Sequence, residues 1–132
     1  MENSAFQFTN PVLKEFEFIP NPGFDISRNK EVNMQNNISF QVTKMNDSNE
    51  AEVCLTVEIG EKSELIPFWI KASEFARFKW EDGIDSRIVD SLLNENAPAL
   101  LLSFLRPIIS QITAFSPFGI YNIPFINFTK SE

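Results

Sequence analysis

The segment from Ala97 to Phe115 constrains the fold more than any other part of the chain. On a helix, its polar residues recur three or four positions apart and form one narrow stripe: Ser103, Arg106, Ser110 and Thr113. Apolar side chains cover most of the remaining circumference: Leu100, Leu101, Phe104, Leu105, Ile108, Ile109, Ile112 and Phe115. A helix that is apolar on so many sides must be buried on more than one of them.

One sheet covers only one side of such a helix, so we expect a second subunit to cover the rest. We therefore predict a homo-oligomer, a dimer or larger, with these residues at its interface: Leu101, Phe104, Arg106, Ile108 and Ile112. Arg106 would make an ion pair or bind carbonyl groups across that interface, and the alternative is a solvated arginine. The 14 phenylalanines exceed the needs of a small core, which also favours a groove or an interface.

The chain before this helix has the alternating pattern of β-strands. Strands are expected over residues 5–18, 38–43, 52–59 and 65–80, and Pro11 indicates an edge strand or a bulge in the first of them. Short turns join the later strands. This arrangement predicts a four-stranded antiparallel meander, with one face free to contact water.

Two helices are expected after the last strand. Asp85 or Ser86 would cap a short helix through Leu93, and a second helix would begin at Asn96 or Ala97. The apolar pattern stays in phase across Pro107, so we expect a kink near Ser103, one turn earlier, and no helix end. The sequence thus predicts a single α+β domain over residues 1–132, a four-stranded antiparallel sheet followed by two helices packed on it.

Residues suited to catalysis are scarce. The chain has no histidine, and its one cysteine, Cys54, lies in an alternating strand pattern. Glu81, Asp82 and Asp85 cluster, but a capped turn at a helix start explains them. With only four glycines there is no loop of the kind that holds phosphate groups. We expect no enzyme, no catalytic residue, no metal and no cofactor.

The charge distribution excludes nucleic acid as a partner. The net charge is −7, and the 11 basic residues are scattered along the chain. The N-terminus lacks the basic and apolar regions of a signal peptide. Ser103, Arg106 and Gln111 interrupt the longest apolar stretch, so we expect no membrane span. A single cysteine fits a reducing compartment, and we predict a cytoplasmic protein.

The last third of the chain carries an ordered set of residues: Pro98, Phe104, Arg106, Ile109, Ile112, Phe118, Asn122, Ile126, Asn127 and Phe128. This order resembles the C-terminal half of the SecB export-chaperone family. That family has a proline at the start of its main helix, an aromatic residue and an arginine inside it, an aromatic turn and a closing apolar-Asn-Phe signature. The chain departs from the pattern at Gly119, where proline is usual, and at Pro107, where an acidic residue is usual.

The resemblance implies a four-stranded sheet with helices packed against it, and a tetramer built as a dimer of dimers. It also implies a cytoplasmic holdase that keeps unfolded precursor polypeptides competent for export and delivers them to the SecA motor. The sequence ends at Glu132. We therefore expect the family's final helix and tail to be absent, which counts against delivery to SecA.

A holdase needs aromatic surfaces, because ring faces accept side chains of many shapes. We predict that polypeptides bind to the following residues: Phe16, Phe18, Phe24, Phe68, Trp69, Phe118 and Tyr121. A place in the core remains open for each of them. Phe24 is the strongest candidate for exposure, because it lies in a loop rich in proline and glycine.

Two further functions stay open. A SecB-like chaperone dedicated to one partner, such as an antitoxin, would share the fold. A structural or ligand-binding protein that has kept the fold without chaperone activity would share it too.

Overall fold

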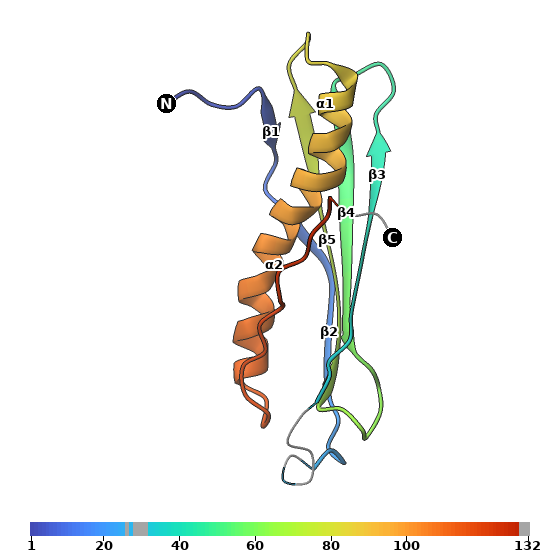
Figure 1. Ribbon diagram of the computed structural model, residues 1–132, viewed down its shortest axis with the longest axis vertical. Helices are drawn as coiled ribbons and strands as arrows, with labels where there is room; N and C mark the ends of the chain where they lie inside the picture. Colours follow the sequence, from blue (N-terminus) through green and yellow to red (C-terminus); the bar gives the residue numbers. More distant parts are fainter. Residues whose placement is uncertain (26, 28–31, 130–132) are drawn as a thin grey trace.

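The computed structural model describes residues 1–25, 27 and 32–129. One long helix packs on one face of a five-stranded antiparallel sheet (Figure 1). The strands are β1 (Phe6–Phe8), β2 (Val12–Pro20), β3 (Asn36–Lys44), β4 (Glu50–Gly60) and β5 (Phe68–Trp80). The α+β class predicted from the sequence is confirmed.

The predicted first strand is two strands, so the sheet has five strands where four were expected. Both β1 and β2 pair with β5, and the chain between them passes through Pro11, which has no N–H group for a ladder bond. Lys14 is an extra residue, because Leu13 pairs with Glu74 and Glu15 pairs with Ser73. The expected interruption near Pro11 is therefore present.

The sheet is not a simple meander. β3, β4 and β5 pair in chain order, but β2 pairs with β5 and not with β3, which follows it in the chain. β5 is thus the strand that joins the two halves of the sheet, and β3 forms the opposite edge.

The two predicted helices form one continuous helix. α1 (Ser86–Ser91) passes through the π-helical turn η1 (Leu92–Asn96) into α2 (Ala97–Ala114). The Ala97 N–H group bonds to the Leu92 carbonyl, one residue further back than in an α-helix. This wider turn precedes Pro98, whose ring would crowd the carbonyl four residues earlier. The expected Asp85 cap is confirmed, and α2 continues past Pro107.

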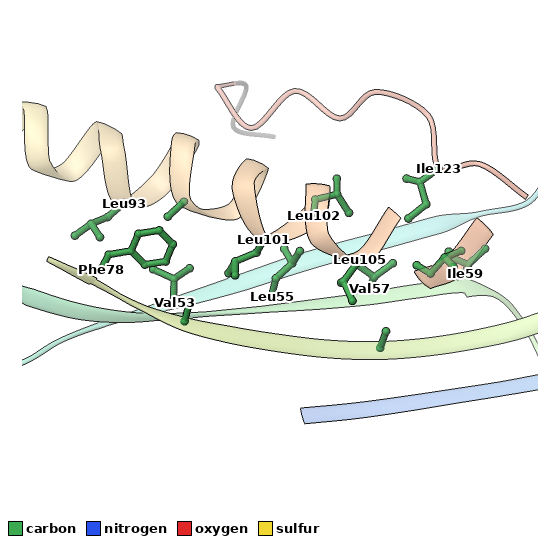
Figure 2. Close-up of a cluster of buried hydrophobic side chains, with 14 of the residues drawn as sticks. Val53, Leu55, Val57, Ile59, Phe78, Leu93, Leu101, Leu102, Leu105 and Ile123 are labelled. Atoms are coloured by element: carbon green, nitrogen blue, oxygen red, sulfur yellow. The ribbon is translucent and has the colours of Figure 1, made fainter. Parts of the chain in front are cut away.

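The core lies between α2 and the sheet (Figure 2). Alternate residues of β4 face the helix and are fully buried: Val53, Leu55, Val57 and Ile59. Leu101 and Leu105 of α2 cover them and are also fully buried. Burying one such leucine contributes about 1.5–3 kcal/mol to folding. The alternation predicted for this strand is confirmed.

The continuous helix has the length and apolar composition of a membrane span despite its polar interruptions, and the expectation of no span stays a prediction. Residues Ser86–Ala114 form a 29-residue helix that is long and apolar enough to cross a bilayer. Core helices of soluble proteins satisfy the same length and composition. Here Leu93, Leu101, Leu105 and Ile109 lie against the sheet with no exposed surface.

Candidate polypeptide-binding site

Aromatic rings from four separate segments meet at one end of the molecule. Phe18 of β2 packs on Phe68 of β5 with ring centroids 5.7 Å apart, and Phe68 contacts Tyr121 at 5.8 Å. Phe24, in the loop after β2, meets Phe118 edge to face at 5.5 Å. These five predicted residues therefore lie in ring-to-ring contacts between the sheet, the loop and the turn after α2.

Hydrogen bonds fix the turn that carries Tyr121. Its backbone N–H donates to Thr113 Oγ1 at 2.9 Å, and its hydroxyl donates to Asn36 Oδ1 at 2.8 Å. Thr113 is fully buried, and its own hydroxyl donates to the Ile109 carbonyl at 2.8 Å. Thr113 is thus an anchor for the following segment and not part of an exposed polar stripe.

Two expectations about exposure are wrong. Phe24 is only 6% exposed, because the loop folds back and places its ring against Phe118. Phe68 is 3% exposed and belongs to the core, beneath Tyr121. Phe16, Phe18, Phe118 and Tyr121 are half-buried at the margin of the core.

Trp69 does not join this cluster, because neighbouring residues of a strand point to opposite faces. Its indole N–H donates to Glu58 Oε2 at 3.1 Å, and Lys62 Nζ lies 4.3 Å from the ring centroid. The residue is 8% exposed on the sheet face away from α2. It is a packed residue of that face.

β3 has an open edge that sequence reasoning did not identify. The Met45 N–H bonds to the Glu50 carbonyl, and the Gly60 N–H bonds to the Gln35 carbonyl, each at 2.9 Å. Bonded and non-bonded pairs alternate along an antiparallel ladder. Backbone groups of these residues therefore point away from β4: Asn36, Ile38, Phe40, Val42 and Lys44. No described strand pairs with that edge.

A hollow of about 740 Å³ runs along this edge. The chain from Asn36 to Phe40 forms its floor, and the C-terminal residues Ile126–Phe128 form one wall. Phe128 packs edge to face on Phe40 with centroids 6.0 Å apart. On the other side of the edge, Thr56, Glu58 and Lys71 line the hollow. Apolar, amide and charged groups thus surround an exposed length of backbone.

The C-terminal segment runs back along α2 after its turn (Figure 1). Arg106 holds this segment, since its guanidinium donates to the carbonyl groups of Ile123 and Pro124. Ile123 is buried in the core beside Leu102 (Figure 2). Arg106 thus binds carbonyl groups as expected, but those of its own chain. An additional role across a subunit interface stays a prediction.

The predicted interface residues divide between two sides of α2. Leu101 is fully buried against the sheet, so its assignment to a subunit interface is wrong. Phe104 is 42% exposed, Ile108 is half-buried and packs against the core, and Ile112 is half-buried. Phe115 is 84% exposed beyond the helix end. Their place in an interface stays a prediction.

Glu74 is a buried acid that sequence reasoning missed. It lies in phase with Ala72 and Ala76 on the helix-facing side of β5, and that alternation was readable from the sequence. The side chain is 2% exposed, and its Oε1 atom has no hydrogen-bond partner. Burial raises the pKa of Glu74 from 4.5 to about 7.

The acidic cluster before α1 has the structural role expected of it. Asp85 accepts a hydrogen bond from the Arg87 N–H at 2.8 Å, and Asp82 accepts one from Asn49 Nδ2 at 2.5 Å. Within the described residues, no group of three or more His, Cys, Asp or Glu side chains is arranged to hold a metal ion.

A family model described as "Preprotein translocase subunit SecB" matches residues 3–130. The chain belongs to the SecB family. The resemblance inferred from the last third of the chain is confirmed, and the match extends it over the strands. Membership of this chaperone family supports a chaperone over an enzyme.

Two solved structures share the fold of this SecB-family chain. One is the Mycobacterium tuberculosis Rv1957 SecB-like chaperone in complex with a ChAD peptide from the Rv1956 HigA1 antitoxin. It matches with a TM-score of 0.64 and 10% identity, over 92% of this chain and 90% of that chain. A protein of unknown function from Streptococcus agalactiae matches with a TM-score of 0.56 and 10% identity, over 91% of this chain and 97% of that chain. No curated protein matches the chain.

Proposed function

We propose that this SecB-family protein is a cytoplasmic holdase that binds extended apolar segments of unfolded polypeptides along the edge of β3. The open backbone edge beside the hollow carries the proposal. An added strand would bond to the outward groups of Ile38, Phe40 and Val42 whatever its sequence. A chaperone that binds many unfolded clients requires such sequence-independent bonding.

Apolar side chains next to this edge supply the remaining affinity. Ile38, Phe40 and Val42 pack against the core on the helix side and are half-buried. Phe128 packs on Phe40, and it lines the same hollow as Ile126 and Ile38. An extended segment directs alternate side chains to the two faces of the sheet, so every second side chain would meet this apolar wall.

Association of several chains would raise the affinity further. We infer that the flank of α2 that carries the exposed Phe104, with the half-buried Ile108 and Ile112, packs against another copy in a dimer or a tetramer. Each copy contributes one β3 edge, and a long client that occupies two edges gains affinity through effective concentration. Precursors for export are the client class that family membership favours, and delivery to SecA is a separate question.

The test uses Ile38→Pro, which removes one outward N–H group without removing a ladder bond to β4. Proline is tolerated at such edge positions. Ile38→Ala is the matched control, because it shortens the side chain and keeps the N–H group. We expect Ile38→Pro to suppress aggregation of an unfolded model client several-fold less well than wild type, and Ile38→Ala to retain most of the activity.

Circular dichroism and the thermal midpoint establish that both variants are folded. A folded Ile38→Pro variant with wild-type activity would contradict binding at the β3 edge. A wild-type protein that protects none of several unrelated clients would contradict a general holdase. That result would favour a chaperone dedicated to one partner or a binding protein without chaperone activity.

A further inference from the structure

Glu74 is a buried acid that the proposed groove does not use. Its register partners are Leu13 on β2 and Leu55 on β4, and its neighbours on the same face are Ala72 and Ala76. It is thus a carboxyl group set in an apolar surface, 2% exposed and with one oxygen unbonded. A charged carboxylate in such a place is strongly disfavoured unless water reaches it.

No basic side chain among the described residues neutralises Glu74. The charged residues of the surrounding strands on the helix-facing side or at the bulge are Lys14 on β2 and Lys44 on β3; those of the helix are Arg87 and Asp90 on α1, Glu95 on η1 and Arg106 on α2. Lys44 pairs with Asp90 at 2.7 Å, and Arg87 pairs with Asp85 at 3.7 Å. Arg106 bonds to the carbonyl groups of Ile123 and Pro124.

Lys14, the remaining cation, is exposed at the bulge and forms no bond to Glu74. On the helix-facing side of β4 and β5, the other positions near Glu74 are apolar, as are Phe6 and Phe8 of β1. A negative charge on Glu74 would therefore have to be stabilised by water.

The edge of the sheet beside Glu74 is interrupted by a bulge and by the break between β1 and β2. Glu74 pairs with Leu13 directly before the extra residue Lys14, and no residue between Phe8 and Val12 belongs to a strand. Leu13 is 45% exposed although it lies opposite a buried residue. A small separation of β2 from β5 at this bulge would admit water to the carboxyl group.

We propose that Glu74 is a proton-controlled lock on β2. The neutral carboxyl group allows β2 and α2 to close over it, and the ionised group opens the bulge and exposes the apolar face of the sheet. This proposal is independent of polypeptide binding at the β3 edge.

The direction of the pH effect follows from burial. The pKa of Glu74 is about 7 in the closed state, against 4.5 for a solvated carboxyl group. The closed state binds the proton more tightly, so its extra stability is full below about pH 4.5 and is lost as pH rises from 4.5 through about 7. For these two pKa values, the opening constant rises about tenfold between about pH 6 and pH 8.

Amide hydrogen exchange at the two pH values tests the lock, after correction for the intrinsic exchange rate. We expect the amides of residues 15–19 in the wild-type protein to lose about tenfold in protection at the higher pH. The Glu74→Gln variant, whose side chain cannot ionise, should show no such change. Glu17→Gln is the matched control, because Glu17 is an exposed acid on the other face of β2 and this variant should behave as wild type.

Two results would overturn the proposal. One is the same loss of protection in Glu74→Gln and wild type. The other is an equal loss in β3 and β4, because the lock acts on β2. If Glu74→Gln does not fold, the carboxyl carbon of Glu74 in wild-type protein can be titrated by NMR. A midpoint near 7 supports the lock, and a midpoint near 4.5 rejects it.

Discussion

Thr113 shows how one buried hydroxyl determines the path of the chain after α2. Its side chain bonds back to the helix at the Ile109 carbonyl and accepts the N–H group of Tyr121. The ring of Tyr121 then covers Phe68, and its hydroxyl reaches Asn36 on β3. A residue that looked like part of a polar surface stripe therefore connects three parts of the site.

We predict that Thr113→Val destabilises the protein by about 1–3 kcal/mol, because it leaves the Tyr121 N–H group without its acceptor. Valine has nearly the same side-chain volume as threonine, so the change creates no cavity. Chemical denaturation measures this loss. Ser110→Ala is the matched control, since the Ser110 hydroxyl bonds only to the Pro107 carbonyl of its own helix, at 3.2 Å. Equal losses for the two variants would show that the Tyr121 bond contributes nothing.

The C-terminal segment after α2 has no regular secondary structure within the described residues, and a few contacts hold it. Ile123 is buried and Phe128 rests on Phe40, but Phe125 is fully exposed between them. Hollows lie on both sides of residues 126–128, one toward β3 and one toward α2. Arg106 compensates for the lack of secondary structure by bonding to two consecutive carbonyl groups. This segment forms a wall of the proposed groove, so its position affects the width of the groove.

We predict that Arg106→Lys loosens this segment, because an ammonium group cannot reproduce the two-carbonyl geometry of a guanidinium. The expected loss of stability is about 1–2 kcal/mol. Amide exchange should accelerate over residues 120–129 and stay unchanged in α2. Arg87→Lys is the control, because the Arg87 side chain is 91% exposed. Unchanged exchange over residues 120–129 would mean that Ile123 and Phe128 hold the segment without Arg106.

At the scale of the whole molecule, apolar side chains stay exposed along the flank of α2 that carries Phe104. Phe104 packs on Phe8 at a ring distance of 6.2 Å, yet both rings are more than 40% exposed. Phe115, directly after α2, is 84% exposed, and Phe125, in the C-terminal segment, is 102% exposed. Large apolar surfaces of this kind are typical of subunit interfaces. A second copy covering this side would explain why the helix is apolar on several sides.

We predict that Ile108→Asp splits the oligomer, because a carboxylate beside Phe104 would be buried without a partner in the interface. Light scattering at micromolar concentration measures the mass of wild type and variant. Leu65→Asp is the control, since Leu65 is 78% exposed in the turn before β5, away from α2. A wild-type monomer, or an Ile108→Asp variant of unchanged mass, would contradict assembly through this side of α2.

Patterns within a single element were predictable from the residues that form it. Alternation placed Val53, Leu55, Val57 and Ile59 on one face, and Asp85 marked the start of the helix, because both signals depend on neighbours in the sequence. The ordered residues of the last third indicated the SecB family, which the match over residues 3–130 confirms. Pro11 marked the interruption that divides the predicted first strand into β1 and β2.

Contacts between distant segments decided the rest, because burial depends on which surfaces meet. Phe24 is covered by Phe118, and no local pattern in its loop contains that information. The open edge of β3 exists because β2 crosses over to pair with β5, a choice of partner that alternation does not specify. Glu74 fits the alternation of its strand, so its position on the buried face was predictable. That its carboxyl group has an oxygen without a hydrogen-bond partner depends on the packing of α2 and β2, which place no basic side chain beside it among the described residues.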